Sequence, residues 1–142
     1  SEESGILKSM NAPNAVIRVL VIDDEKGLRD MLTHTLRRME FEVAVAEDGE
    51  KGVAAALAGD FDVVVCDVMM PGMDGFAVIE RLKRSRPALE VVMVTGFPTD
   101  ETSARAMELG AFEYLAKPYD LTALCAVLEA AVARKRGRPG GA

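Results

Sequence analysis

Five short apolar segments, most of them rich in valine, alternate with segments of helical period along this chain of 142 residues. Their nearly continuous apolar character predicts strands that are covered on both faces. Five such β/α units predict an α/β domain over residues 16–134, with a parallel sheet between two layers of helices. The expected strands are residues 16–22, 43–46, 62–66, 90–94 and 112–116. The expected helices are residues 28–39, 49–58, 74–85 and 100–109, and a last one from about residue 120.

The two ends of the chain lack this alternation. Residues 1–15 are polar or small and show no period, so we expect a flexible N-terminal arm. Residues 135–142 are basic and rich in Gly and Pro, which predicts a tail or a truncated linker. The stretch Arg136-Gly137-Arg138-Pro139 resembles the core of an AT-hook, which binds the DNA minor groove. Four residues are a weak signal, and we do not expect this tail to contact DNA.

Composition narrows the functional classes. The net charge is −6, and four basic residues lie within residues 134–138, so the rest of the chain is more acidic than the total. An acidic body does not attract nucleic acid through its net field. No apolar run approaches the roughly 18 residues of a membrane span, and the acidic start is unlike a secretory signal. We expect a cytoplasmic protein without membrane contact, with Cys66 and Cys125 buried and free.

Polar residues follow four of the five expected strands. The carboxyl ends of parallel strands share one edge of a sheet, where ligands bind in such folds. Crowded carboxylates repel each other, and an oxygen-only set without His or Cys suits Mg²⁺. An Asp after a strand can instead cap a helix, but capping does not explain the joint placement. The residues concerned are Asp23, Asp24, Asp67, Thr95 and Lys117; Asp24 and Asp74 are the candidates for caps.

Four motifs resemble, in order and spacing, the receiver domain of bacterial two-component response regulators. They are I-D-D-E, V-C-D-V-M-M-P-G-M-D-G, V-T-G and K-P-Y. The resemblance implies a doubly wound (βα)5 fold whose five-stranded parallel sheet has the flavodoxin-like order 2-1-3-4-5. It also implies a phosphorylation-switched signalling module. Its partners would be a sensor histidine kinase or phosphotransfer protein, and a downstream protein or output domain.

The same resemblance implies a role for each site residue. Asp67 would be the phospho-acceptor, taking the phosphoryl group from a histidine kinase or a small phosphodonor. Asp24 and Asp67 would bind Mg²⁺ directly, Asp23 would do so through water, and Met69 would contribute its backbone carbonyl. Lys117 would pair with Asp67 before reaction and with the phosphoryl group afterwards, and we expect its bond to the following proline to be cis.

A conformational switch is implied as well. Thr95 would move its hydroxyl onto the phosphoryl group, and Tyr114 would fill the vacated space. The alternative for Tyr114 is an ordinary half-buried strand aromatic. The readout face would comprise the fourth helix, fifth strand and fifth helix, at residues 100–109, 112–116 and from 120. A homodimer could form through this face.

Three positions tune such sites in the family. Met69 and Phe97 are apolar here, where many receivers carry polar groups that help to orient an attacking water. We therefore expect a long-lived acyl phosphate. Gly96 leaves room for the switch and for access of the donor.

Three features of the sequence bear on alternative functions. The domain is expected to catalyse only its own phosphorylation and dephosphorylation, and so is not an enzyme toward other substrates. A phosphotransferase of the haloacid dehalogenase type needs a second Asp where Met69 stands, and a cap domain for which the length leaves no room. A receiver that no longer accepts phosphate conflicts with the intact acidic set. Nothing in residues 1–134 separates a stand-alone receiver from the input half of a DNA-binding regulator.

Overall fold

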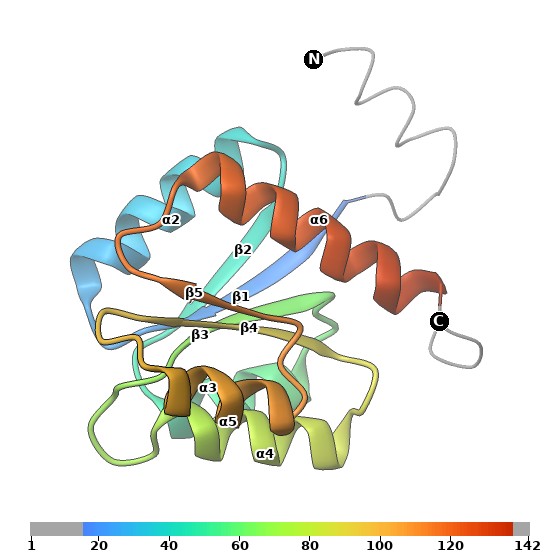
Figure 1. The fold of residues 1–142 in the computed structure, drawn as a ribbon. Coiled ribbons are helices and arrows are strands. Elements are labelled where there is room, and N and C mark those ends of the chain that lie inside the picture. Colours follow the sequence, from blue (N-terminus) through green and yellow to red (C-terminus); the bar gives the residue numbers. More distant parts are fainter. Residues whose placement is uncertain (1–15, 138–142) are drawn as a thin grey trace.

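The computed structural model describes residues 16–137 and contains one five-stranded parallel sheet (Figure 1). The strands lie in the order β2-β1-β3-β4-β5, which confirms the fold and strand order expected from the sequence. The strands are β1 (Arg18–Ile22), β2 (Glu42–Ala46), β3 (Val63–Asp67), β4 (Glu90–Thr95) and β5 (Glu113–Ala116). The helices are α2 (Lys26–Arg38), α3 (Gly49–Ala58), α4 (Gly75–Ser85), α5 (Asp100–Glu108) and α6 (Leu121–Gly137).

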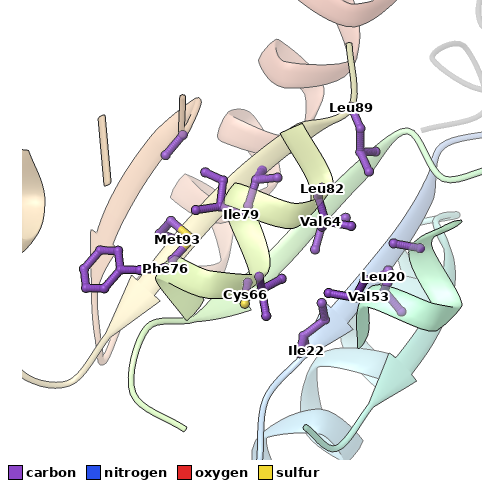
Figure 2. Close-up of a cluster of buried hydrophobic side chains, with 14 of the residues drawn as sticks. Leu20, Ile22, Val53, Val64, Cys66, Phe76, Ile79, Leu82, Leu89 and Met93 are labelled. Atoms are coloured by element: carbon purple, nitrogen blue, oxygen red, sulfur yellow. The ribbon is translucent and has the colours of Figure 1, made fainter. Parts of the chain in front are cut away.

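Helices cover both faces of the sheet. α2 and α6 lie on one face, and α3, α4 and α5 lie on the other (Figure 1). The central strand β3 is buried along its whole length, with Val64 and Cys66 in the cluster on the α3–α5 side (Figure 2). Val63 and Val65 point into the second cluster, beneath α2 and α6. This alternation explains the unbroken apolar runs, because each side of the strand meets a helix layer.

Element boundaries agree with the sequence within about two residues except at the C-terminal end. α6 continues to Gly137, so residues 135–137 of the expected tail are helical. Ion pairs explain this extension: the Nε atom of Arg134 lies 2.8 Å from Glu90 Oε2, and Arg136 Nη2 lies 3.3 Å from Asp62 Oδ2. The expected arm of residues 1–15 and residues 138–142 lie outside the described residues.

Two smaller expectations concern the described part of the chain. Cys66 and Cys125 are both buried and free, as predicted. No helix within residues 16–137 combines the length and the apolarity that crossing a membrane requires.

Candidate functional site

Asp67 is the last residue of β3, and only 6% of its surface is exposed. The chain then turns through Pro71 and Gly72, whose φ of 73° is accessible to glycine at little cost, and enters α4 beside the strand end. Gly75, the first residue of α4, lies so close that a Cβ atom there would be 2.3 Å from the carbonyl oxygen of Asp67. The glycine therefore lets the helix start pack directly against the strand that carries the candidate nucleophile.

Three carboxylates converge at this edge of the sheet. Asp23, Asp24 and Asp67 each place one oxygen within 4.8 Å of the others. Asp23 is buried and Asp24 is exposed. Of the two residues expected as possible helix caps, Asp74 does cap a helix. Its side chain accepts a hydrogen bond from the Ala77 amide at the start of α4. The capping interpretation of Asp24 is wrong, because the N-cap of α2 is the next residue along the chain.

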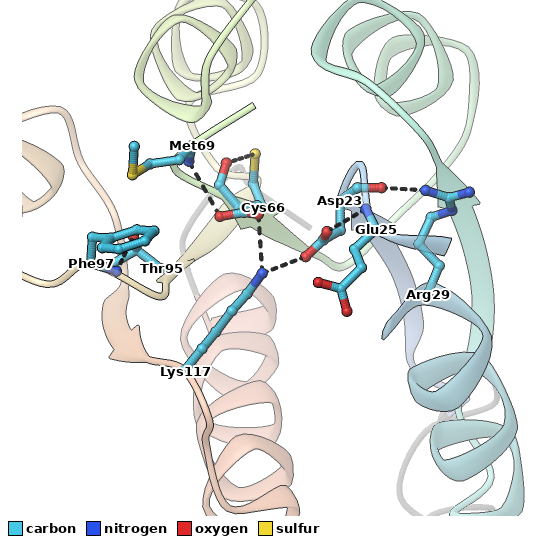
Figure 3. Close-up of polar contacts among 9 residues, drawn as sticks. Asp23, Glu25, Arg29, Cys66, Met69, Thr95, Phe97 and Lys117 are labelled. Carbon is cyan, nitrogen blue, oxygen red and sulfur yellow. Dashed lines mark hydrogen bonds and ion pairs between the residues drawn. The ribbon is translucent and has the colours of Figure 1, made fainter. Parts of the chain in front are cut away.

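Lys117, which follows β5, reaches across to two of these carboxylates. Its Nζ atom lies 2.9 Å from Asp23 Oδ2 and 3.0 Å from Asp67 Oδ2 (Figure 3). The bond from Lys117 to Pro118 is cis, as expected. Sequence reasoning anticipated the pairing with Asp67 but not the one with Asp23.

The balance of burial and charge sets the titration of this pair. Burial raises the pKa of Asp67 above its ordinary value, although the hydrogen bond from Lys117 opposes this. Burial also lowers the pKa of Lys117, but its hydrogen bonds to Asp23 and Asp67 outweigh burial and leave that pKa raised. The lysine therefore stays charged at neutral pH, and one ammonium faces three carboxylates.

The excess negative charge at this edge would favour a bound metal ion. Within residues 16–137, one group of acidic, His or Cys side chains clusters closely enough to hold an ion. It consists of Asp23, Asp24 and Asp67. They offer only carboxylate oxygens, and the exposed Asp24 opens the group to solvent. A hard divalent cation such as Mg²⁺ suits that donor set. The amide of Met69 donates a hydrogen bond of 3.2 Å to Asp67 Oδ1, so the loop after β3 also orients the acceptor.

The residues expected to switch or tune the site lie around it. Thr95 ends β4, is 1% exposed, and its hydroxyl accepts a hydrogen bond of 3.1 Å from the Phe97 amide. Gly96 has open space where a side chain would project. Met69 and Phe97 are 55% and 73% exposed, and they lie on the side of the site away from Asp23 (Figure 3). The two exposed apolar side chains form a rim beside Asp67.

Tyr114 lies in β5 and contacts a residue that sequence reasoning missed. Its hydroxyl oxygen is 2.6 Å from Oγ1 of Thr102 in α5. A signal for Thr102 was present, because Thr99 and Thr102 have the spacing of an N-cap residue and its N3 partner. Arg29 was missed too, and its Nη1 atom donates a hydrogen bond of 2.7 Å to the carbonyl of Asp23.

Comparisons with known proteins agree with this architecture. The sequence model of the response regulator receiver domain matches residues 19–129. The DNA-binding transcriptional regulator NtrC of Rhizobium meliloti is 36% identical over 121 residues, which cover 85% of this chain and 25% of that protein. The transcriptional regulatory protein TcrA of Mycobacterium tuberculosis is 41% identical over 116 residues, 80% of this chain and 45% of its own.

A solved structure shows the same fold. A response regulator receiver domain protein from Clostridium thermocellum superimposes with a TM-score of 0.81 at 30% identity, over 85% of this chain and 98% of its own. The chain thus spans nearly all of that receiver domain but from a quarter to under a half of the two transcriptional regulators.

Proposed function

Because this chain belongs to the response regulator receiver domain family, we propose that it is a signalling module that accepts a phosphoryl group on Asp67. The observation that carries the proposal is the position of this carboxylate. It clusters with the carboxylates of Asp23 and Asp24, and its Oδ2 atom lies 3.0 Å from the Lys117 ammonium. The donor would be a sensor histidine kinase, a phosphotransfer protein or a small phosphodonor.

The transfer is a displacement at phosphorus. An oxygen of Asp67 forms the new O–P bond, while the P–N bond of a phosphohistidine, or the P–O bond of a small donor, breaks with its electron pair going to the donor. Lys117 Nζ lies 3.0 Å from Asp67 Oδ2, so its ammonium can stabilise negative charge on the phosphoryl oxygens. Mg²⁺ would be held by Asp24, Asp67 and the Met69 carbonyl, with Asp23 acting through water, and it would neutralise the same charge.

Phosphorylation would change the conformation of the domain through Thr95 and Tyr114. Thr95 would turn its hydroxyl away from the Phe97 amide and onto the phosphoryl oxygens, which draws the loop after β4 toward Asp67. Tyr114 would then occupy the vacated space. The face made by α5, β5 and α6 would change and so control a downstream partner, an output domain or a homodimer.

The proposal extends to the setting in which the domain works. The domain would turn over no substrate beyond its own aspartyl phosphate, and it would act in the cytoplasm. The names of NtrC and TcrA favour an output in transcription. A gel-shift assay on the full-length gene product, with and without phosphodonor, tests that part: a complex that does not respond to phosphorylation would contradict it.

Intact mass spectrometry after incubation with acetyl phosphate and Mg²⁺ tests the central assignment. The wild-type protein is expected to gain one phosphoryl group, and Asp67→Asn none. Asp48→Asn is the matched control, because Asp48 caps α3 through the Lys51 amide and asparagine caps a helix equally well. A phosphoryl group that persists in Asp67→Asn would refute the proposal.

A further inference from the structure

The hydroxyl of Tyr114 is bound to the start of α5, and the local hydrogen bonds define how. Thr102 Oγ1 lies 3.1 Å from the Thr99 amide, which donates to it, and 3.1 Å from the Thr99 carbonyl, to which it can donate. Thr99 Oγ1 accepts from the Thr102 amide at 3.0 Å, which completes a capping box. Tyr114 is therefore attached to the cap of a helix and not to an isolated surface hydroxyl.

The Thr102 hydroxyl has more neighbours than it can bind at once. A threonine hydroxyl has one hydrogen and two lone pairs. Its oxygen lies within hydrogen-bond distance of the Thr99 amide, carbonyl and hydroxyl, the last at 2.9 Å, and either hydroxyl can donate in that contact. The fourth neighbour is the Tyr114 hydroxyl at 2.6 Å, where again either oxygen can donate. This fourth contact is the one that joins the cap of α5 to β5.

The helix that carries Thr102 is the one with the smallest buried face. Ala106 is the buried residue of α5, whereas α4 and α6 each bury five residues. A helix held by little apolar burial can shift at small cost, so single polar contacts weigh more in its position. The stacking of Arg105 over the Phe76 ring, 4.5 Å from its centroid, holds the other side of α5.

The same cap is joined to the proposed switch residue through a short segment. Thr95 ends β4 and Thr99 is the N-cap of α5, so only residues 96–98 lie between them. A movement of Thr95 toward Asp67 would pull this segment and the cap with it. Thr102 and its acceptor position would shift away from Tyr114, and the tyrosine ring would lose the bond that holds it.

We propose that Thr102 is a positioning residue that couples the loop after Thr95 to the orientation of Tyr114, by holding the tyrosine in its resting position. This inference rests on the proposed Thr95 and Tyr114 switch. Removing the Thr102 hydroxyl deletes its hydrogen bond to Tyr114 in the resting orientation. The switched orientation lacks this bond and therefore loses nothing. The protein should then populate the switched orientation without a phosphoryl group.

Fluorine NMR can follow Tyr114 alone. The chain has two tyrosines, and Tyr119 has a buried hydroxyl that makes no hydrogen bond with the described residues, so Tyr119→Phe is a conservative background. The signal of 3-fluorotyrosine at Tyr114 is recorded with and without Mg²⁺ and beryllofluoride, which serves as the phosphoryl mimic. Without the mimic, the Tyr114 signal of Thr102→Val should move toward the position that the signal has when beryllofluoride is bound. The ratio of switched to resting protein should rise about fivefold.

Three variants separate coupling from a general effect on helices. Thr102→Ser keeps the hydroxyl and should retain the wild-type signal. Thr122→Val makes the same chemical change in the first turn of α6 and should also leave the signal unchanged. Thr99→Ala removes the cap but keeps the Thr102 hydroxyl, and it should shift the signal less than Thr102→Val. An equal shift in Thr99→Ala, or none in Thr102→Val, would overturn the coupling.

A second measurement does not depend on the labelled tyrosine. The affinity for beryllofluoride, read from its own bound fluorine signal, should tighten by the same factor in Thr102→Val and Tyr114→Phe, and no further in the double variant. Independent, additive changes would overturn the proposal. If the mimic binds but leaves the wild-type Tyr114 signal unmoved, the proposed switch itself fails, and the coupling fails with it.

Discussion

The two edges of the sheet both carry buried carboxylates, but their charge balance is opposite. At the amino edge, Glu90 is fully buried at the start of β4, with Arg134 at 2.8 Å and Lys83 at 3.5 Å. Asp62, beside it before β3, faces Lys135 at 3.8 Å and Arg136 at 3.3 Å. Two carboxylates there meet four cations. At the carboxyl edge, Lys117 pairs with two of the three clustered carboxylates, Asp23 and Asp67.

The acids of the amino edge stabilise the fold, whereas those of the carboxyl edge are placed to react. Cations supplied by α4 and α6 neutralise the acids of the amino edge, and those contacts hold the end of α6 on the body. The carboxyl edge keeps an excess of negative charge near solvent, which costs stability and leaves room for a cation and a phosphoryl group. A buried carboxylate therefore indicates a reactive site only where neighbouring cations do not neutralise it.

Replacement of Lys117 gives the largest expected effect. Lys117→Met should slow phosphorylation by acetyl phosphate by about 100-fold or more, since the one ammonium beside the acceptor is lost. Rates of phosphoryl gain by intact mass measure this. Lys135→Met, a change of the same kind at the amino edge, should leave the rate unchanged. An equal loss in both variants would erase the distinction between the edges.

At the amino edge, removal of a cation should cost more than removal of the acid. Arg134→Leu leaves the buried Glu90 with Lys83 as its cation and should lower the free energy of unfolding by about 2 kcal/mol. Glu90→Met should cost less, because the half-exposed Arg134 can reach water. Urea unfolding of both variants and of the double variant measures this. Strictly additive losses would show that the pair does not act as a unit.

The apolar rim of the carboxyl edge should lengthen the life of the phosphoryl group. Polar side chains at both rim positions, Met69→Asn with Phe97→Glu, can orient a water toward phosphorus and should speed hydrolysis by about 10-fold. Phosphate release from the phosphorylated protein reports the rate. Loss within seconds in the wild-type protein, unaltered by the double substitution, would contradict a protective rim.

Replacement of Asp67 should have the smallest effect, a change in stability that depends on pH. The pKa of Asp67 is raised in the folded protein, so its ionised form destabilises the fold. This penalty is absent well below the ordinary carboxyl value near 3.8 and complete above the raised folded-state pKa. Without metal, Asp67→Asn should therefore be more stable than wild type near neutral pH, by on the order of 0.5 kcal/mol after solvent screening.

Acidification provides the check on that last prediction. The advantage of Asp67→Asn in urea unfolding should shrink as pH falls through this window, and Mg²⁺ should stabilise the wild-type protein more than the variant. A variant less stable than wild type at neutral pH would mean that Asp67 is balanced like the acids of the amino edge.

Local patterns in the sequence were sufficient for the elements and for the acidic cluster, whereas Arg29 and Thr102 were missed. Valine-rich runs and helical spacing depend on neighbouring residues, so β3 and α4 could be placed within a residue or two. The acids after β1 and β3 could be assigned to one edge because parallel strands end together. The helical residues 135–137 were missed, since the ion pairs of Arg134 and Arg136 join them to acids far away in the chain.

The amino-acid sequence by itself determined five β/α units, two buried sheet faces and an acidic edge around Asp67. Tertiary structure alone decided which partners meet there. Lys117 bridges Asp67 and Asp23 across 50 and 94 residues of sequence, and Thr102 reaches Tyr114 across a helix and a turn. Periodicity is a property of short segments, whereas these contacts depend on the order of strands and on how closely α5 packs against β5.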